Sequence, residues 1–196
     1  MKKKVISIIV AMAVSVSFAI PTYAVNEELS VVRVVQQPNT QVCWACCGVS
    51  LCHYYGMNQA ALDSFILRVK SVVDYSLPGS YLDIQAGMGL YGMLTESHNP
   101  DAPVRLTSSF IGETIAASDP LIVGGKAFNY NVSSDVFDHF FIISGYDDET
   151  DMMDPRVVIV DSISGIKRNY QFSYLNSFLP TETAPFVSTE VYVRVR

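Results

Sequence analysis

The stretch Cys43-Trp44-Ala45-Cys46-Cys47-Gly48-Val49-Ser50-Leu51-Cys52 contains every cysteine of this 196-residue chain. These thiols are too close together in sequence to close useful loops, so little or no disulfide stabilisation is expected. The run is apolar and is followed by Gly56, which predicts a helix over Val42–Tyr55. Most of its side chains are small, so we expect neighbouring elements to approach this helix closely, with the helix running through the middle of the fold between two lobes.

Outward from this segment, the sequence changes from a helical to an extended pattern. Three more helices are predicted in the first half: Ala60–Val73 with Asn58 as its N-cap, Tyr81–Leu94, and the short Ser109–Ala117. Apolar runs separated by Gly, Pro and polar residues predict strands in the second half: Leu121–Gly125, His139–Tyr146, Val157–Asp161 and Val187–Val195. Helices followed by strands predict an α+β fold whose two halves face each other across a cleft.

The first residues have the features of a secretory signal peptide. Lys2, Lys3 and Lys4 precede an apolar run that reaches about Ile20, and Thr22-Tyr23-Ala24 fits a small-residue cleavage site. The predicted organisation is a signal peptide at residues 1–24 and one domain at residues 25–196, secreted from the cell. The apolar run is shorter than the roughly 18 to 20 residues that span a bilayer, so we expect no membrane association after cleavage.

The charge balance limits the kinds of partner. The signal segment holds three of the 13 basic residues and none of the 19 acidic ones, which leaves the domain a net charge near −9. Such a chain repels a phosphate backbone, so nucleic acid is excluded as an expected partner. We expect no cofactor and no metal. The acidic turn at residues 147–154 lacks the glycine and terminal Glu spacing of an EF-hand, which favours a solvated hairpin loop over a calcium site.

Cys43 lies at the predicted start of a helix, where a thiol can become a nucleophile. A cysteine attacks an acyl carbon as a thiolate, and the partial positive charge at a helix N-terminus lowers the pKa of the thiol. The thiolate needs a base, and His139 is favoured because it is expected to begin an apolar strand, with its ring at a sheet end. His53 lies about three turns away on the same helix, and His98 lies in a polar loop.

A third group is needed to orient the imidazole. Asp161 ends an apolar run, where an acid is costly unless it has a partner, and a strand beside that of His139 would supply one. Asp138 is a weaker candidate, because adjacent residues of a strand point to opposite faces. Asp161 is therefore the predicted third group.

The oxyanion that forms during acyl transfer needs hydrogen-bond donors. The backbone N–H of Cys43 and the side-chain amide of Gln37 are the candidates. Gln36 and Gln41 compete for this role, and the six-residue offset from Cys43 is what favours Gln37.

These residues resemble the papain-like cysteine peptidases. Gln37, five intervening residues and Cys43-Trp44-Ala45 are similar to the Gln-to-Cys-Trp segment of that family. The segments Pro120–Gly124 and Asp138–Asp147 are similar to the region of the catalytic histidine in its compact secreted bacterial members, which include bacteriocin-processing double-glycine peptidases and avirulence-type proteases. The resemblance covers roughly Val32–Phe178.

The resemblance implies a papain-like fold, with an N-terminal helical lobe that carries the nucleophile helix packed against a C-terminal antiparallel β-sheet lobe. It implies hydrolysis of a protein or peptide by Cys43, with His139 as base, Asp161 as third group and Gln37 at the oxyanion. Two features depart from the family. Ser162 follows the acid where the bacterial branch commonly has Pro, and the short segment before Cys43 leaves no room for a long inhibitory propeptide.

Three other function classes compete with a peptidase. Cys43-Trp44-Ala45-Cys46 is formally a C-x-x-C motif at a helix start, as in thiol-disulfide oxidoreductases, although that function leaves His139 and Asp161 without a role. The same Cys-His-Asp order also occurs in transglutaminase-like acyltransferases. A catalytically silent binding module is the third alternative, and the complete set of four groups makes it less favoured. Oligomeric state is not indicated.

Overall fold

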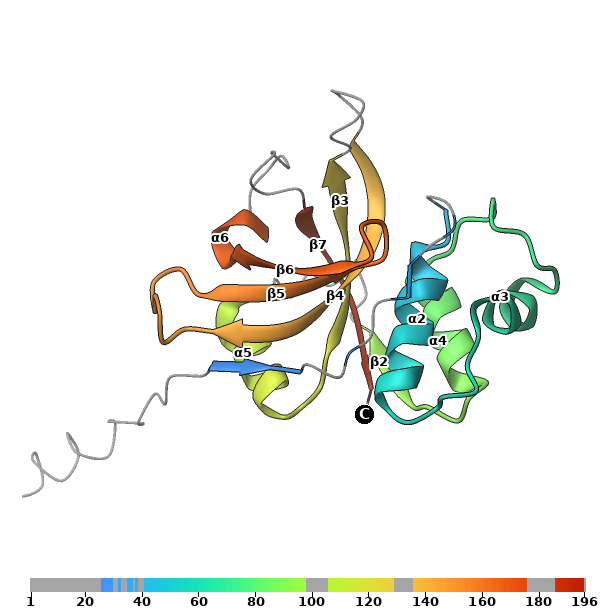
Figure 1. Cartoon of the computed structure of the whole chain (residues 1–196), viewed down its shortest axis with the longest axis horizontal. Coiled ribbons are helices and arrows are strands. Elements are labelled where there is room, and N and C mark those ends of the chain that lie inside the picture. The colour runs from blue at the N-terminus through green and yellow to red at the C-terminus, as the bar shows by residue number, and fades with distance from the viewer. Residues whose placement is uncertain are drawn as a thin grey trace, which may run out of the picture.

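The computed structural model describes residues 26–29, 32, 35–36, 38, 41–97, 106–128, 136–175 and 186–195. The predicted signal segment, Gln37 and His98 lie outside these residues. The fold is α+β, and in chain order its elements are β1 Asn26–Glu28, α2 Cys43–Tyr54, α3 Leu62–Lys70, α4 Tyr81–Gly89, β2 Thr95–Ser97, α5 Ser108–Ala116, β3 Leu121–Phe128, β4 Val136–Asp147, β5 Arg156–Asp161, β6 Ile166–Gln171, α6 Phe172–Leu175 and β7 Phe186–Val195 (Figure 1). Within this part of the chain, no helix is long and apolar enough to cross a membrane.

The strands of the described residues form one antiparallel sheet in the order β2-β7-β3-β4-β5-β6, with β1 paired to β4. The long strand β4 organises this sheet. On one edge of β4, the first part pairs with β3, up to the pair Leu121↔Ile143. The last part of the same edge pairs with β1, from the pair Glu28↔Gly145 onward. On the other edge of β4, the pairing with β5 covers Ile142–Asp147. The earlier part of that edge, which includes His139, therefore faces other elements.

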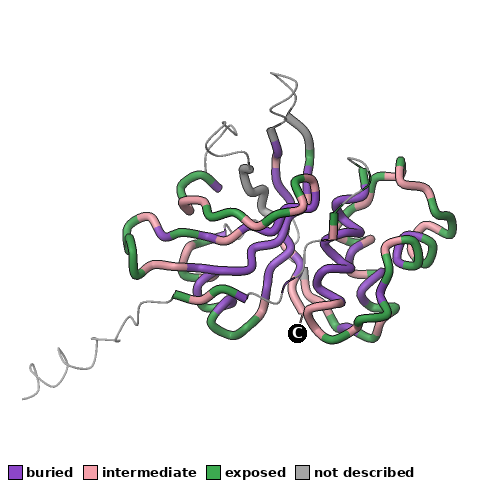
Figure 2. The backbone as a smooth tube through the Cα atoms, viewed as in Figure 1, coloured by how far each residue is buried: buried purple, intermediate pink, exposed green. Residues whose placement is uncertain are grey.

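Helix α2 lies between the sheet and the helices α3 and α4. It contacts β4 on one side and α3 and α4 on the other, and every residue from Cys43 to Cys52 is buried (Figures 1 and 2). The predicted central position of this helix is confirmed. An apolar helix without a polar face requires such a place, because any exposed side would leave apolar surface in water.

Close packing around Phe65 explains two of the helical glycines. A Cβ on Gly48 of α2 would lie 2.5 Å from Phe65 Cζ, and a Cβ on Gly87 of α4 would lie 2.1 Å from the same atom. The Phe65 ring of α3 is thus packed between α2 and α4, at positions where any residue with a Cβ would clash with the ring. The small residues predicted to permit close approach do so here.

The boundaries of α3 and α4 differ from the prediction. α3 begins at Leu62 rather than at residue 60, and its N-cap is Ala61 rather than Asn58. The backbone N–H of Ala60 bonds Met57 O in a tight turn, so the chain is not yet helical there. α4 ends at Gly89 rather than at residue 94, because turns that end with Gly92 at φ +81° stop it.

The expectation that His139 begins its strand was wrong. Strand β4 starts at Val136, where it pairs with Phe128 of β3, and His139 is its fourth residue, opposite Gly125. Asp138 lies inside the strand opposite Lys126 of β3, and its side chain is exposed, so an acid is tolerated there. The ring therefore lies within the strand rather than at its end. Strands β1, β2 and β6 and helix α6 had not been predicted.

Candidate active site

The nucleophile candidate Cys43 is the first residue of α2. The N-cap residue Val42 makes no side-chain cap bond, and the first turn contains no acidic residue. The first N–H groups of a helix have no carbonyl partner within it. The partial positive charge at the start of α2 is therefore not neutralised by a cap or an acid, and it can stabilise a negative charge placed there. The group placed there is the thiol of Cys43, whose residue is only 6% exposed.

The strand register brings His139 and Asp161 together. Residues Ile142 and Val160 are partners, so the next position along places Asp161 opposite Phe141. His139 lies two residues further along on the same face, at a diagonal position that long side chains can bridge. His139 Nε2 donates to Asp161 Oδ1 at 2.9 Å, and both residues are buried.

The side chains of Cys43 and His139 also interact with each other, through a hydrogen bond and through the attraction of their opposite charges. Because Nε2 is bound to Asp161, the ring nitrogen available to the thiol is Nδ1, which is buried. The helix half thus supplies the thiol, and the sheet half supplies the imidazole and the carboxylate.

The electrostatics favour a thiolate and an imidazolium. Burial alone would raise the pKa of Cys43, but the hydrogen bond and the positive charge of His139 outweigh it and lower the pKa. Burial alone would lower the pKa of His139, but its bonds with Asp161 and Cys43 raise that pKa to about 9. For Asp161, burial is likewise outweighed, chiefly by His139, and its pKa is lowered. All three shifts favour the charged forms.

Two backbone groups add to the stabilisation of the thiolate. Backbone hydrogen bonds from Phe140 and Trp44 lower the pKa of Cys43. A bond that favours the thiolate must come from a donor, so these groups are the backbone N–H groups of the two residues. Phe140 lies on the part of β4 that β5 does not cover, which leaves room for α2 beside it. This contact has no signature in the sequence, because a backbone donor does not depend on residue type.

The other cysteines differ from Cys43. All four are free thiols. Burial raises the pKa of Cys46 and of Cys52 to about 12, and it raises that of Cys47 well above its usual value. These three therefore stay protonated near neutral pH, and Cys43 is distinguished from them by its partners.

Trp44 packs into the helical half. It is fully buried, its indole N–H donates to Leu77 O at 3.4 Å, and its ring fills the space a side chain at Gly79 would need. The Lys70 ammonium lies 5.3 Å from the ring centroid. These contacts give Trp44 a packing role within the helical half.

The rival acid and histidine lie elsewhere. Asp138 points away from His139, is exposed, and forms an ion pair with Lys126. His53 Nε2 donates to Ala60 O at 2.6 Å near the C-terminal end of α2. Both serve local structure.

The oxyanion prediction is only partly covered by the described residues. Gln37 lies outside them, whereas its neighbour Gln36 is described: a Cβ on Gly165, in the turn after Asp161, would lie 3.1 Å from Gln36 Cδ. Gln41 is exposed in the turn before α2. Val35 N donates to Ser50 Oγ of α2 at 3.2 Å, which fixes the approach of this segment to the helix.

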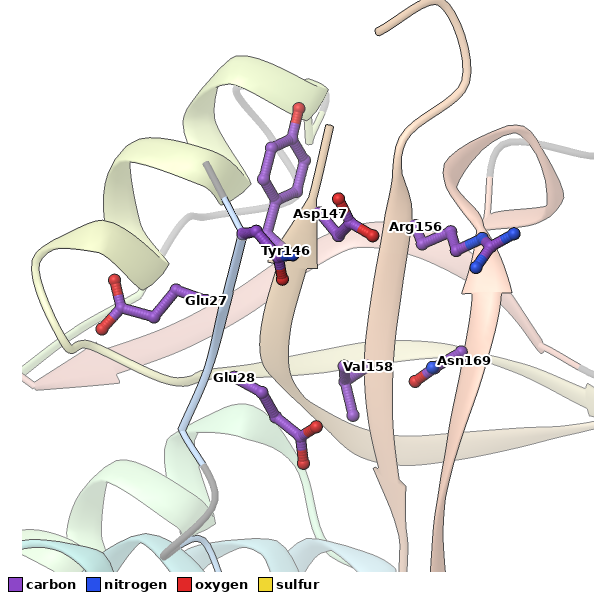
Figure 3. A pocket seen from close by; sticks show the side chains of 8 residues that line it. Glu27, Glu28, Tyr146, Asp147, Arg156, Val158 and Asn169 are labelled. Carbon is purple, nitrogen blue, oxygen red and sulfur yellow. The ribbon is translucent and has the colours of Figure 1, made fainter. Parts of the chain in front are cut away.

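A small pocket lies at the far end of β4. It has a volume of about 90 Å³ and is lined by Asn26, Glu27, Glu28, Tyr146, Asp147, Arg156, Val158 and Asn169 (Figure 3). Asp147 is eight residues from His139 along the strand, which corresponds to roughly 25 Å at about 3.3 Å per residue. This pocket is therefore separate from the cysteine site.

The acidic turn after β4 uses its carboxylates internally. Asp147 accepts bonds from the backbone and hydroxyl of Thr150, and Asp151 accepts from Met153 N and Asp154 N. Among the described residues, no group of three or more His, Cys, Asp or Glu side chains could hold a metal ion. The hairpin structure of this turn agrees with the solvated loop that was favoured.

Comparison with known proteins does not place the chain in a family. Neither a scan against protein families nor a search of curated proteins finds a match. The functional argument therefore depends on the geometry of the site.

Proposed function

We propose that this chain is a secreted, papain-like cysteine peptidase that acts on proteins or peptides. The observation that carries the proposal is the convergence of Cys43, at the start of a central helix, with His139 and Asp161 on one face of the sheet. A buried thiol with a lowered pKa beside a histidine with a raised one is the arrangement that nucleophilic cysteine catalysis requires.

In the proposed reaction, the Cys43 thiolate attacks the carbonyl carbon of the substrate, and an S–C bond forms as the carbonyl electrons move to oxygen. The backbone N–H of Cys43 and the amide of Gln37 are the proposed oxyanion donors. The His139 imidazolium then gives its proton to the leaving amine as the C–N bond breaks. His139 next takes a proton from water, the hydroxide attacks the thioester, and the acid product leaves with the thiolate restored.

Asp161 has a supporting part in this scheme. Its carboxylate accepts from Nε2 and so keeps Nδ1 directed toward the sulfur, and its charge stabilises the imidazolium. Hydrolysis and transfer to an amine share the same thioester and differ in the acceptor. A redox function has less support, because Cys46 is completely buried and its pKa is raised to about 12.

A thiol-directed epoxysuccinyl probe tests the proposal. We expect the folded protein to be alkylated on Cys43 alone, and mass spectrometry of a digest locates the label. Cys43→Ala should abolish both labelling and the release of new N-termini from an unfolded protein substrate. Cys46→Ala is the matched control and should keep both, because this thiol is buried and protonated.

Other outcomes separate the alternatives. Full hydrolysis by Cys43→Ala, or no label on Cys43 in folded protein, would contradict a cysteine peptidase. A reversible disulfide between Cys43 and Cys46, with disulfide exchange lost in Cys46→Ala, would indicate redox chemistry. Products that incorporate an added primary amine in place of water would indicate an acyltransferase.

A further inference from the structure

Ser50 is the one hydroxyl residue among the ten buried residues of α2. It follows Cys43 by seven positions, which places it on the same face of the helix, about 10 Å further along the axis. Only 2% of Ser50 is exposed. A hydroxyl in such a place is costly unless it has hydrogen-bond partners, so its partners indicate its role.

The Ser50 hydroxyl acts both as donor and as acceptor. Ser50 Oγ donates to Cys46 O at 2.8 Å, one turn back on the helix, and it accepts from Val35 N at 3.2 Å. The first bond orients the hydroxyl, and the second uses a lone pair that the first leaves available. The side chain thus joins the nucleophile helix to a segment that lies 15 residues earlier in the chain.

The segment that Ser50 binds passes close to the candidate site. Val35 packs against the core. The next residue, Gln36, lies beside the turn that follows Asp161, because a Cβ on Gly165 would come within 3.1 Å of Gln36 Cδ. The segment therefore has the helix that carries the thiol on one side and the turn that follows the carboxylate on the other.

The chain from this segment to the nucleophile begins and ends on α2. Its first attachment is the bond between Val35 N and Ser50 Oγ, and its second is the start of the helix, where Val42 O accepts from Cys46 N. Ser50 and Cys43 are about 10 Å apart along the helix axis, whereas the eight residues from Val35 to Cys43 could extend over roughly 26 to 29 Å. The bond to Ser50 therefore restricts a chain that is much longer than the distance it covers.

We propose that Ser50 is a positioning residue of the candidate active site, which acts through Val35 to place the segment before Cys43 for stabilisation of the oxyanion. This inference rests on the proposed function, in which the amide of Gln37, two residues after Val35 in the sequence, is an oxyanion donor. Its physical content is a difference between two reactions of the same thiol, and neither reaction requires a peptide substrate.

The two reactions are acylation by 4-nitrophenyl acetate and alkylation by iodoacetamide, each located at Cys43 by mass spectrometry. In acylation the thiolate adds to the carbonyl carbon, negative charge develops on the carbonyl oxygen, and 4-nitrophenolate leaves as the thioester forms. In alkylation an S–C bond forms as iodide leaves, and no oxyanion develops. The ratio of the two rates therefore reports the oxyanion donors and cancels changes in the thiolate population.

Ser50→Ala removes the hydroxyl and leaves Val35 N without this acceptor. We expect the acylation rate to fall by roughly 3- to 30-fold, with the alkylation rate within about twofold of the wild type. In a Gln37→Ala background the same change should lower acylation by less than about twofold, because the donor that Ser50 positions is already absent. Should Ser50→Ala fail to fold, as judged by its melting curve, Ser50→Cys carries the test, because a thiol fills a similar space and accepts an N–H bond weakly.

Thr114 of α5 provides the matched control. It is also buried, and its hydroxyl donates to Phe110 O, four residues earlier on its helix, at 2.7 Å. Among the described residues, no backbone N–H donates to this hydroxyl. Thr114→Val removes the hydroxyl at nearly constant volume, so the ratio of the two rates should stay as in the wild type. A ratio lowered as in Ser50→Ala would mean a general loosening of the fold and would overturn the proposal.

Other results that overturn the proposal are an unchanged ratio in folded Ser50→Ala, an equal fall in acylation and alkylation, and a loss of acylation that is as large in the Gln37→Ala background as in the wild type. A wild-type Cys43 that iodoacetamide alkylates and the ester does not acylate overturns it too, because there is then no oxyanion site to position.

Failure of the peptidase proposal is a separate result. A chain that cleaves no peptide but shows the lowered ratio in Ser50→Ala retains the positioning role and loses the peptidase function. If a peptide substrate is found, kcat of Ser50→Ala should fall by a factor similar to that for acylation, with KM within about twofold.

Discussion

The donors around Asp161 explain why a carboxylate suits this position better than an amide. Both oxygens accept hydrogen bonds, from His139 and Ile163 on one side and from Ser164 on the other. An asparagine offers one acceptor and one donor, so its NH₂ group must face an N–H and leave a buried donor without a partner. Its lack of charge also removes support for the imidazolium.

Asp161→Asn should therefore reduce activity and change its pH dependence. The carboxylate is one cause of the raised pKa of His139, so its removal lowers that pKa. The imidazolium is then lost at a lower pH, and the alkaline limit of the kcat/KM profile moves down from near 9. We expect kcat to fall by roughly 10² to 10⁴-fold.

Asp138→Asn is the control for this change, because Asp138 is exposed and bonded to Lys126. It should leave both the rate and the alkaline limit as in the wild type. An Asp161→Asn variant with an unaltered alkaline limit would contradict the assigned role of the charge.

The residues that the sequence could identify are those whose chemistry depends on their side chains. Cys43, His139 and Asp161 were predicted from residue type and from the alternation of a strand, and the structure brings them together. Phe140 was not, since its contribution is a backbone N–H. The turn after Asp161, whose backbone N–H groups bond the carboxylate, had a signal in its turn-forming residues, but its relevance follows only from the register of β4 and β5.

Helix α2 depends on the absence of a side chain at Gly48. Alanine is the better helix former, but its Cβ would lie 2.5 Å from Phe65 Cζ. The Phe65 ring cannot move away, because Gly87 is equally close on the other side. This packing links α2, α3 and α4, and α2 positions the nucleophile.

Gly48→Ala should therefore destabilise the protein by about 1 to 3 kcal/mol and lower the melting temperature by roughly 3 to 10 °C. Gly89→Ala is the matched control, because a Cβ at this last residue of α4 meets nothing within 4 Å. That variant should be neutral or stabilised by up to about 1 kcal/mol. Thermal unfolding followed by circular dichroism measures both, and equal melting temperatures would contradict the packing argument.

The helices and strands were predicted where periodicity or apolar runs are strong, and their ends were not. α3 and α4 are shorter than expected because turns that end at Ala60 and begin at Leu90 use local backbone bonds. The short strand β2 and the polar strand β6 have too few apolar residues to reveal themselves. These two segments are strands because they pair with β7 and β5, and a local sequence pattern does not reveal such tertiary pairing.

The candidate site requires the helical half and the sheet half to keep their relative position. Cys43 contacts β4 at one end of α2. At the other end, the Tyr55 hydroxyl donates to Asp119 Oδ1 at 3.1 Å, and the Tyr54 hydroxyl donates to Ser118 O at 2.8 Å. These bonds reach the connection between α5 and β3, so α2 is attached to the sheet half at both of its ends.

Tyr55→Phe should loosen the distant attachment and leave the site intact. The loss of one partly buried hydrogen bond costs about 0.5 to 1.5 kcal/mol, which lowers the melting temperature of a chain of this size by roughly 1 to 6 °C. Cys43 lies twelve residues away, about 18 Å along the helix axis, so the rate at which iodoacetamide alkylates Cys43, measured against pH at 25 °C, should match the wild type. Tyr91→Phe is the control, because Tyr91 stacks on Phe65 and has no hydroxyl bond among the described residues. A Tyr55→Phe profile in which the pKa of Cys43 is higher than in the wild type would instead mean that the distant attachment sets the geometry of the thiolate pair.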